Sequence, residues 1–145
     1  MDRAAIQTGD VKGMQPLALA FLGDAVYEIY IRRYVIEKGF RTVSAMHRET
    51  IKFVKAKSQC EAVKKLFPLL TEEEAAVVRR GRNANPHTVP KNADMADYRY
   101  ATALESLFGY LYLMGSSQRL EALMKAAVEI IEEEYRNLHD RPAKQ

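Results

Sequence analysis

Two long apolar segments constrain the fold of this 145-residue chain more than any other feature of its sequence. Residues 17–38 and 94–114 are each of helical length, and each is followed by a glycine, Gly39 or Gly115, that can end a helix in a left-handed turn. Pro16, just before the first segment, is favourable in the first turn of a helix, and Asp94 can cap a helix over the second segment. No stretch alternates apolar and polar residues for long enough to indicate a strand. The sequence therefore predicts an all-α fold.

The rest of the chain contains signals for further helices. Ser44 can cap a second helix that runs to about residue 65, before Pro68 interrupts the chain. An amphipathic pattern over about residues 117–138 predicts the last helix.

A capping box separates the second helix from the second apolar segment. In the sequence from Thr71 to Glu74, the side chains of the first and last residues can each satisfy a backbone N–H group. The short helix that follows is expected to end at Gly81. Residues 82–93 are predicted to form a long loop, because they contain two prolines, three asparagines and no apolar periodicity.

The organisation of the chain indicates one domain over residues 1–145, since no repeat or linker divides it. We expect about five main helices, with residues 1–15 and 139–145 loosely ordered. The single cysteine, Cys60, excludes an internal disulfide and a cysteine-based zinc site, and it fits a reducing cytoplasm. No run of 18 uncharged apolar residues indicates a membrane span, so the expected location is cytoplasmic, with no membrane partner.

Each long apolar segment contains an isolated carboxylate. Asp24 is the only charged residue in 17–27, and Glu105 is the only one in 100–114. Helices that are apolar nearly all round are normally buried, and a carboxylate there must be paired, protonated or bound to a cation. One such residue is consistent with ordinary pairing, whereas two on separate helices favour a shared acidic site. The pattern predicts a Mg²⁺ site at Asp24 and Glu105, with Mn²⁺ able to substitute.

Two neighbours of Asp24 each allow two interpretations. Gly23 lies inside the expected helix, where glycine is kept either for the approach of a ligand or for a close crossing of two helices. Glu28 lies one turn after Asp24 and is either an additional metal carboxylate or the ion-pair partner of Arg32. The sequence leaves both choices open.

The segment 79–91 is basic and contains no acidic residue, although the net charge of the chain is only +3. Its amides, imidazole and hydroxyl suit phosphate and ribose oxygens, so we favour nucleic-acid binding over a merely solvated surface. Such contacts select the shape of duplex RNA over its sequence. The predicted RNA-binding residues are Arg79, Arg80, Arg82, Asn83, Asn85, His87 and Lys91.

Two motifs resemble the ribonuclease III family. The stretch LAFLGDAVYE, residues 19–28, resembles the signature motif of that family, whose core reads Phe-Leu-Gly-Asp. The stretch ALESLFGYLYL, residues 103–113, resembles its second acidic motif, and the basic segment lies between the two. The resemblance implies a ribonuclease III-like helical endonuclease domain that forms a homodimer and cleaves double-stranded RNA with Mg²⁺. It also implies that Asp24 and Glu105 are catalytic metal ligands.

Two positions depart from the family pattern. Ala20 and Thr102 stand where the family usually has carboxylates, one turn before Asp24 and Glu105. The number of bound metal ions therefore depends on whether other carboxylates compensate. The candidates are Glu28, Asp94 and Asp97.

The chain is also similar to the Mini-III subgroup of this family, a nuclease domain without a separate double-stranded-RNA-binding domain. That similarity implies maturation of the ends of large-subunit (23S) ribosomal RNA precursor, helped by a large-subunit ribosomal protein.

The sequence also allows two alternative functions. One is a catalytically inactive double-stranded-RNA-binding module, with Ala20 and Thr102 as marks of a decayed site. The other is a helical interaction protein with an acidic protein partner, which leaves the isolated carboxylates unexplained.

Overall fold

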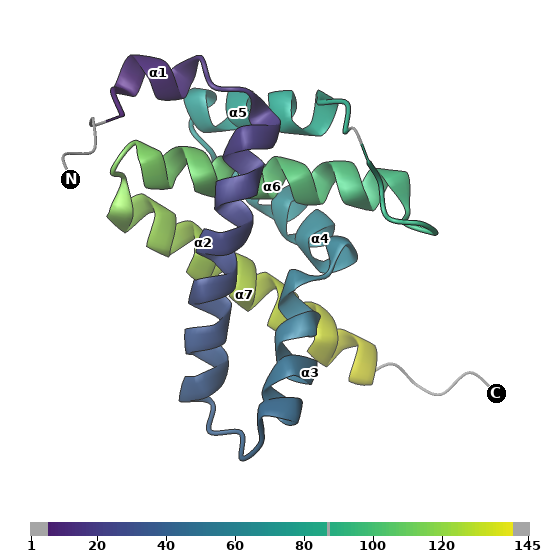
Figure 1. The fold of residues 1–145 in the computed structure, drawn as a ribbon. Coiled ribbons are helices and arrows are strands. Elements are labelled where there is room, and N and C mark those ends of the chain that lie inside the picture. Colours follow the sequence, from purple (N-terminus) through teal and green to yellow (C-terminus); the bar gives the residue numbers. More distant parts are fainter. Residues whose placement is uncertain (1–5, 87, 141–145) are drawn as a thin grey trace.

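The computed structural model describes residues 6–86 and 88–140, which form seven α-helices and one short 3₁₀ helix, without a strand in that part of the chain (Figure 1). The predicted all-α fold is confirmed. In chain order the elements are α1 (Thr8–Lys12), α2 (Pro16–Glu37), α3 (Val43–Val54), α4 (Ala56–Leu66), η1 (Phe67–Leu69), α5 (Glu72–Asn83), α6 (Met95–Leu113) and α7 (Ser117–His139).

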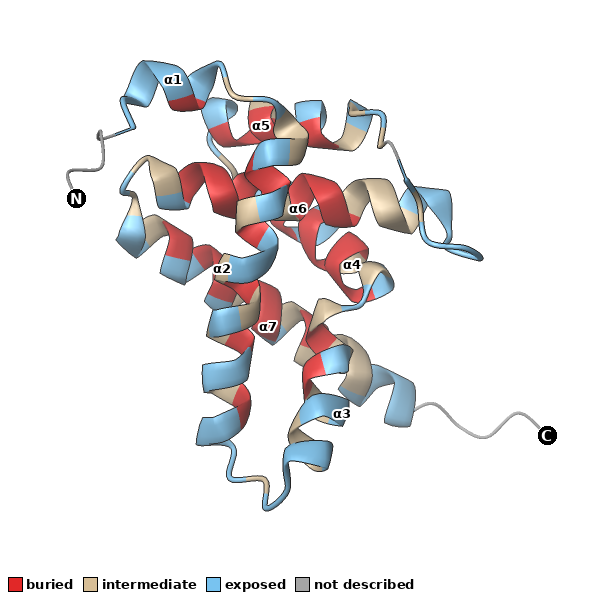
Figure 2. Ribbon diagram, in the orientation of Figure 1, coloured by how far each residue is buried: buried red, intermediate tan, exposed pale blue. Residues whose placement is uncertain are grey.

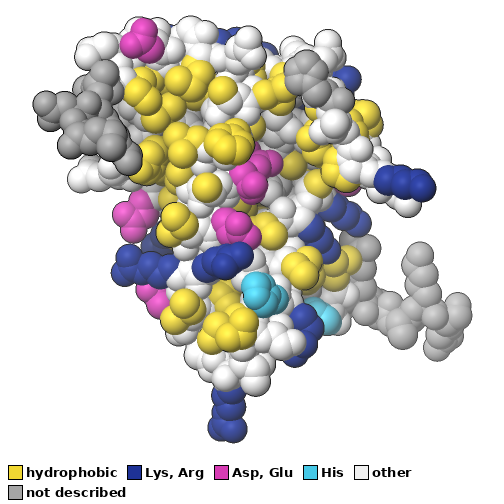
Figure 3. Space-filling view, viewed as in Figure 1, with side chains coloured by type: hydrophobic (Ala, Val, Ile, Leu, Met, Phe, Trp, Pro, Cys, Tyr) yellow, Lys and Arg dark blue, Asp and Glu magenta, His cyan; other side chains and the backbone are white. Residues whose placement is uncertain are grey.

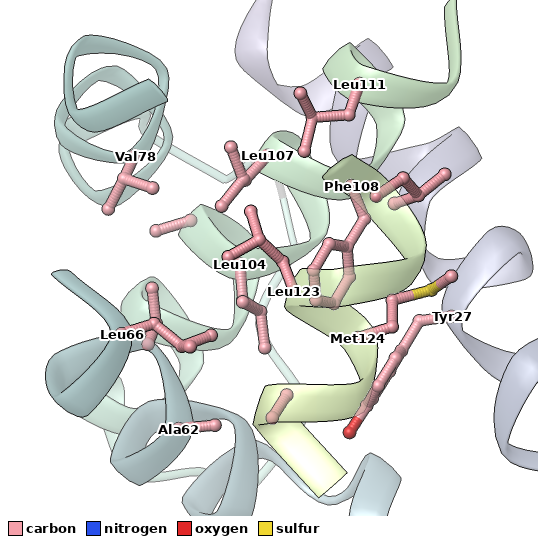
Figure 4. Close-up of a cluster of buried hydrophobic side chains, with 14 of the residues drawn as sticks. Tyr27, Ala62, Leu66, Val78, Leu104, Leu107, Phe108, Leu111, Leu123 and Met124 are labelled. Atoms are coloured by element: carbon pink, nitrogen blue, oxygen red, sulfur yellow. The ribbon is translucent and has the colours of Figure 1, made fainter. Parts of the chain in front are cut away.

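Helix α6 is the centre of the fold, because α2, α4, α5 and α7 all pack against it (Figures 1 and 2). Its side chains Leu104, Leu107 and Phe108 are fully buried. Figure 4 shows them together with Leu66 of α4 and Leu123 of α7. A helix that is apolar on every side is stable in water only when other elements cover all of its sides. The second apolar segment therefore folds as its sequence predicts.

Two glycines allow α2 and α6 to cross with their backbones in close contact. A Cβ atom added to Gly23 would lie 1.7 Å from the carbonyl oxygen of Glu105. One added to Gly109 of α6 would lie 2.0 Å from the carbonyl oxygen of Leu19. Of the two explanations for Gly23, the structure shows the close helix crossing. The crossing also brings Asp24, the next residue along α2, beside Glu105.

The helix predicted from Ser44 to about residue 65 is in fact two helices. Thr42, and not Ser44, caps the first of them, because its hydroxyl accepts the backbone N–H of Ala45 at 3.1 Å. The chain then breaks at Lys55, whose backbone is extended (ψ 149°). The break lets α3 pack against α2 while α4 turns to pack against α6. A local pattern that is helical on both sides of the break does not reveal this change of direction.

Other helix ends agree with the sequence except at two places. The capping box from Thr71 to Glu74 forms both of its hydrogen bonds, and Asp94 caps α6 through the backbone N–H of Asp97. However, α5 continues past Gly81, which is buried against α6 instead of ending the helix. The loosely ordered start that we expected contains α1, which is held by the fully buried side chain of Val11.

One face of α2 is exposed, which corrects the expectation that this helix is buried all round. Phe21, Ile29 and Ile36 are 85%, 71% and 62% exposed, respectively. Figure 3 shows apolar side chains spread over this face, with acidic groups among them. Asp24 is exposed as well. Within the described part of the chain, no helix is both long and apolar enough to span a membrane.

Candidate active site

A cleft of ≈ 690 Å³ lies between α2, the junction of α3 with α4, and α6. The acidic side chains that line it are Asp24 and Glu28 from α2 and Glu105 from α6. Leu17 and Phe21 form part of its apolar wall, and Pro90, from the loop before α6, forms part of its rim. The structure thus brings the two carboxylates that the sequence singled out into one solvent-accessible cleft.

The two carboxyl groups at the crossing of α2 and α6 interact directly. Burial, the negative charge of Asp24 and a hydrogen bond between the two groups together raise the pKa of Glu105 to about 8, and burial contributes most. At neutral pH and without a bound cation, Glu105 is therefore mainly protonated, and its carboxyl group shares a hydrogen bond with that of Asp24. A divalent cation bound here would replace the shared proton and would be held by oxygen ligands, which Mg²⁺ prefers.

The additional candidate ligands differ in their positions. Glu28 lines the cleft, and its carboxylate also accepts a hydrogen bond from the Arg32 guanidinium at 3.3 Å. Asp94 is occupied in capping α6. Burial, and after it a hydrogen bond with the carboxylate of Asp97, raise the pKa of the Cys60 thiol. Neither of these two aspartates is among the described residues that line the cleft.

The positions that depart from the family pattern lie in the same cleft. Ala20 and Thr102 both line it, and the Thr102 hydroxyl donates a hydrogen bond to the carbonyl oxygen of Tyr98 at 2.9 Å. Among the described residues, no group of three or more His, Cys, Asp or Glu side chains is arranged to hold a metal ion. The donor set that fits a cation is therefore the pair Asp24 and Glu105, completed by water, and Mg²⁺ commonly binds to proteins in this way.

The predicted RNA-binding residues occupy the end of α5 and the loop that follows. Arg79, Arg80, Arg82 and Asn83 lie within α5 and not in the loop, whereas Asn85 and Lys91 are exposed in the loop. His87 lies outside the described residues.

Two of the arginines in α5 contact other groups of the protein. Arg80 is exposed and donates to the carbonyl oxygen of Lys12 at 3.4 Å. Arg82 is partly buried and lines a small pocket with Lys64 and Tyr100.

The loop before α6 borders the carboxylate cleft. Pro90 lines the cleft, and the Tyr98 hydroxyl donates to the carbonyl oxygen of Thr88 at 3.4 Å. A polyanion held by this loop would therefore lie next to Asp24 and Glu105.

The sequence did not single out Gln59, which also lines the cleft and is only 3% exposed. The spacing of Gln59, Ala62, Val63 and Leu66 follows the i, i+3, i+4, i+7 pattern of one buried helix face. This spacing is the sequence feature that could have identified Gln59, because it places a polar side chain among core residues.

The raised pKa of Glu105 predicts a pH-dependent stability. Because the pKa of this group exceeds its ordinary value of 4.5, the folded chain binds the proton more tightly than the unfolded chain does. The stabilisation is complete below the ordinary pKa and is lost as the pH rises toward 8. In EDTA, we expect the free energy of unfolding to fall by about 2 kcal/mol over this pH interval. This loss is smaller than the full shift in the pKa of Glu105 would give, because the side chain keeps some hydration.

Urea denaturation across this pH interval measures the effect. Glu105→Gln removes the titrating group and should flatten the pH dependence. Glu129→Gln, at an exposed position of α7, serves as the control and should follow the wild-type curve. Parallel curves for wild type and Glu105→Gln would contradict the assignment of the shift to this residue.

Comparisons with known proteins identify the family of this chain. The ribonuclease III domain family matches residues 17–116, which include Asp24 and Glu105. The chain is 49% identical over 123 residues to a Mini-ribonuclease 3 from Thermoanaerobacter sp. (strain X514), covering 85% of this chain and 87% of that one. It is 47% identical over 129 residues to a Mini-ribonuclease 3 from Clostridium tetani, covering 88% of this chain and 85% of that one.

A solved structure shows the same arrangement of helices. The crystal structure of a protein from Fusobacterium nucleatum matches with a TM-score of 0.74 and 30% sequence identity, covering 83% of this chain and 96% of that one. The family match spans more than half of the chain, and the relatives are matched over most of their length. The chain therefore belongs to the ribonuclease III domain family, among relatives named Mini-ribonuclease 3, and is an endoribonuclease of the ribonuclease III type.

Proposed function

We propose that this endoribonuclease hydrolyses double-stranded RNA with Mg²⁺, and that Asp24 and Glu105 are its catalytic metal ligands. The observation that carries the proposal is that the two side chains meet in one open cleft, where burial and the charge of Asp24 raise the pKa of Glu105. A pair of carboxylates held in this way is poised to exchange a proton for a divalent cation. Mn²⁺, which also prefers oxygen ligands, should substitute.

The chemistry divides between the cation and the protein. When bound, Mg²⁺ supplies a Lewis acid that polarises the phosphodiester and lowers the pKa of the attacking water. Asp24 and Glu105 fix its position, and Glu105 must first lose its proton. Glu28, which lines the same cleft, is available to orient water in it when it is not paired with Arg32.

Incubation of the purified chain with a long RNA duplex and Mg²⁺ tests this proposal. We expect discrete shortened duplex products, and none in EDTA. Binding of the duplex without any products at high protein concentration would instead favour a catalytically inactive RNA-binding module. That alternative has a structural basis, because Ala20 and Thr102 supply no carboxylate to the cleft.

The basic end of α5 and the loop before α6 are proposed to hold the phosphates of the duplex. The loop borders the cleft, and Arg79, Arg80, Asn85 and Lys91 are all exposed. Contacts of this kind release counterions from the nucleic acid, so they make binding dependent on salt.

Replacing Arg80 or Arg82 by alanine should weaken duplex binding and flatten its salt dependence. Each lost phosphate contact is expected to reduce the slope of log K against log salt concentration by roughly 0.7–0.9. Binding measured in EDTA at several salt concentrations checks this without cleavage. Lys125→Ala, an exposed cation of α7, is the control and should keep the wild-type slope. Equal slopes for all variants would remove α5 from the RNA interface.

The exposed face of α2 supports the proposal of a homodimer. Phe21 is 85% exposed and also lines the cleft, and Ile29 and Ile36 extend the apolar surface along the helix. Large exposed apolar patches commonly mark protein–protein interfaces. A second copy packed on this face would cover these side chains and lie beside the catalytic cleft.

The finer biological assignment rests on the relatives. Because the chain matches proteins named Mini-ribonuclease 3 over most of its length, we propose that it matures the ends of 23S ribosomal RNA precursor in the cytoplasm. A large-subunit ribosomal protein is the proposed helper. Accumulation of unprocessed 23S precursor in cells that lack this protein would support the assignment.

A further inference from the structure

The side chain of Gln59 is a buried polar group whose amide oxygen has no hydrogen-bond partner among the described residues. It lies on α4 and is 3% exposed. Its Nε2 atom donates a hydrogen bond to the carbonyl oxygen of Val54 at 2.8 Å. Its Oε1 atom is shielded from solvent and has no hydrogen-bond partner in the described part of the chain. Buried polar atoms without a partner are rare in folded proteins, because each one has lost its hydrogen bonds to water.

The orientation of this amide is fixed by the break between α3 and α4. Lys55 has an extended backbone, so α3 ends at Val54. The carbonyl oxygen of Val54 therefore lacks the backbone N–H donor that a continuing helix would supply. Gln59 Nε2 supplies a donor. The reversed amide would place two acceptor oxygens against each other. The unsatisfied atom is therefore the oxygen, and the group that could satisfy it must be a donor.

The position of Gln59 indicates where that donor binds. Val54, Ala56 and Gln59 all line the cleft that contains Asp24 and Glu105. Because Gln59 lines the cleft and its Oε1 atom has no partner among the described residues, a donor bound within the cleft is the group placed to satisfy it. The cleft has fewer carboxylates than the family pattern, because Ala20 and Thr102 occupy two of the positions where the family usually has them.

We propose that Gln59 is a positioning residue for the hydrated cation, and that its Oε1 atom accepts a hydrogen bond from a water ligand of the metal. This inference rests on the proposed metal site at Asp24 and Glu105. Mg²⁺ keeps several of its waters in proteins, and those waters are strong donors that need acceptors. Groups that bind the ligands of a metal, and not the metal itself, still fix its position and affinity. Gln59 thus adds an oxygen to a cleft that has few carboxylates.

Binding of Mn²⁺ to the full chain without RNA tests this role, with electron paramagnetic resonance as the readout. Gln59→Met keeps the length of the side chain but removes the amide oxygen, and we expect it to weaken Mn²⁺ binding by about tenfold. Gln59→Glu places a negative charge at the same position and should strengthen binding. Gln118→Met, at an exposed position of α7, is the matched control and should bind Mn²⁺ as the wild type does.

The outcomes separate this inference from the proposed function. A purely structural Gln59, which only holds the Val54 carbonyl, would give a lower melting temperature in Gln59→Met with unchanged Mn²⁺ affinity, and that result would overturn the inference. If Gln59→Met does not fold, unchanged or weaker binding by Gln59→Glu would overturn it equally. If the wild type itself binds no Mn²⁺, or binds it as well after Asp24→Asn, the metal site is wrong and the inference fails with it.

Discussion

Replacing Asp24 by asparagine is expected to reduce the cleavage of duplex RNA by a factor on the order of a thousand or more, while RNA binding persists. The physical reason is the small donor set of the cleft. In the proposed site Asp24 and Glu105 hold the cation between them, so the loss of one of these charges removes a large part of its electrostatic stabilisation. Such a factor corresponds to about 4 kcal/mol of transition-state stabilisation.

The fold should tolerate this substitution. Asp24 is exposed, so asparagine leaves the packing intact, and it removes a charge that opposes the ionisation of Glu105. The melting temperature in EDTA should therefore equal or exceed that of the wild type. Single-turnover cleavage, duplex binding in EDTA and thermal denaturation together check the prediction.

The control for Asp24→Asn is Glu37→Gln, at the far end of the same helix, where the carboxylate pairs with Arg33 on the surface. Its cleavage rate should stay close to that of the wild type. Rapid cleavage by Asp24→Asn would refute the assignment of Asp24 as a metal ligand. Loss of cleavage together with loss of folding would show instead that the residue is structural.

Replacing Gly23 by alanine is expected to have the largest effect on stability. The added Cβ atom would lie 1.7 Å from the carbonyl oxygen of Glu105, and the backbone of a central helix cannot move aside as a flexible side chain can. Alanine is the better helix former by about 1 kcal/mol, but this gain is small against the overlap. We expect a net loss of at least about 3 kcal/mol in the free energy of unfolding.

The chain offers a matched control for Gly23→Ala. Gly9 also lies in a helix, α1, and a Cβ atom added to it would meet nothing within 4 Å. Gly9→Ala should therefore leave stability unchanged or raise it slightly. Thermal and urea denaturation of both variants measure the difference. If Gly23→Ala melts at the wild-type temperature, the helices are free to separate, and the crossing does not fix the distance between Asp24 and Glu105.

Local signals in the sequence were sufficient for much of the secondary structure. The capping box from Thr71 to Glu74 and the cap at Asp94 form as predicted, because each depends on groups within one turn of helix. The break at Lys55 was not predicted. Both sides of it are helical by pattern, and it exists because α3 and α4 pack against different helices.

The same distinction applies to the surface of α2. Its sequence is apolar nearly all round, so burial was the natural expectation. In the folded chain only one side packs against α6, and Phe21, Ile29 and Ile36 are exposed. Apolar composition determines that a surface avoids water, but it does not determine whether the same chain or a second copy covers it.

For the site, the sequence by itself determined that Asp24 and Glu105 are exceptional, because a charge isolated in an apolar helix needs a compensating partner wherever the helix packs. Only the tertiary structure decided that each is the other's neighbour, through the crossing at Gly23 and Gly109. The tertiary structure also placed Gln59 in the same cleft and left Asp94 and Asp97 outside its lining. Residues distant in sequence meet only when helices pack, and their packing depends on contacts that no local pattern contains.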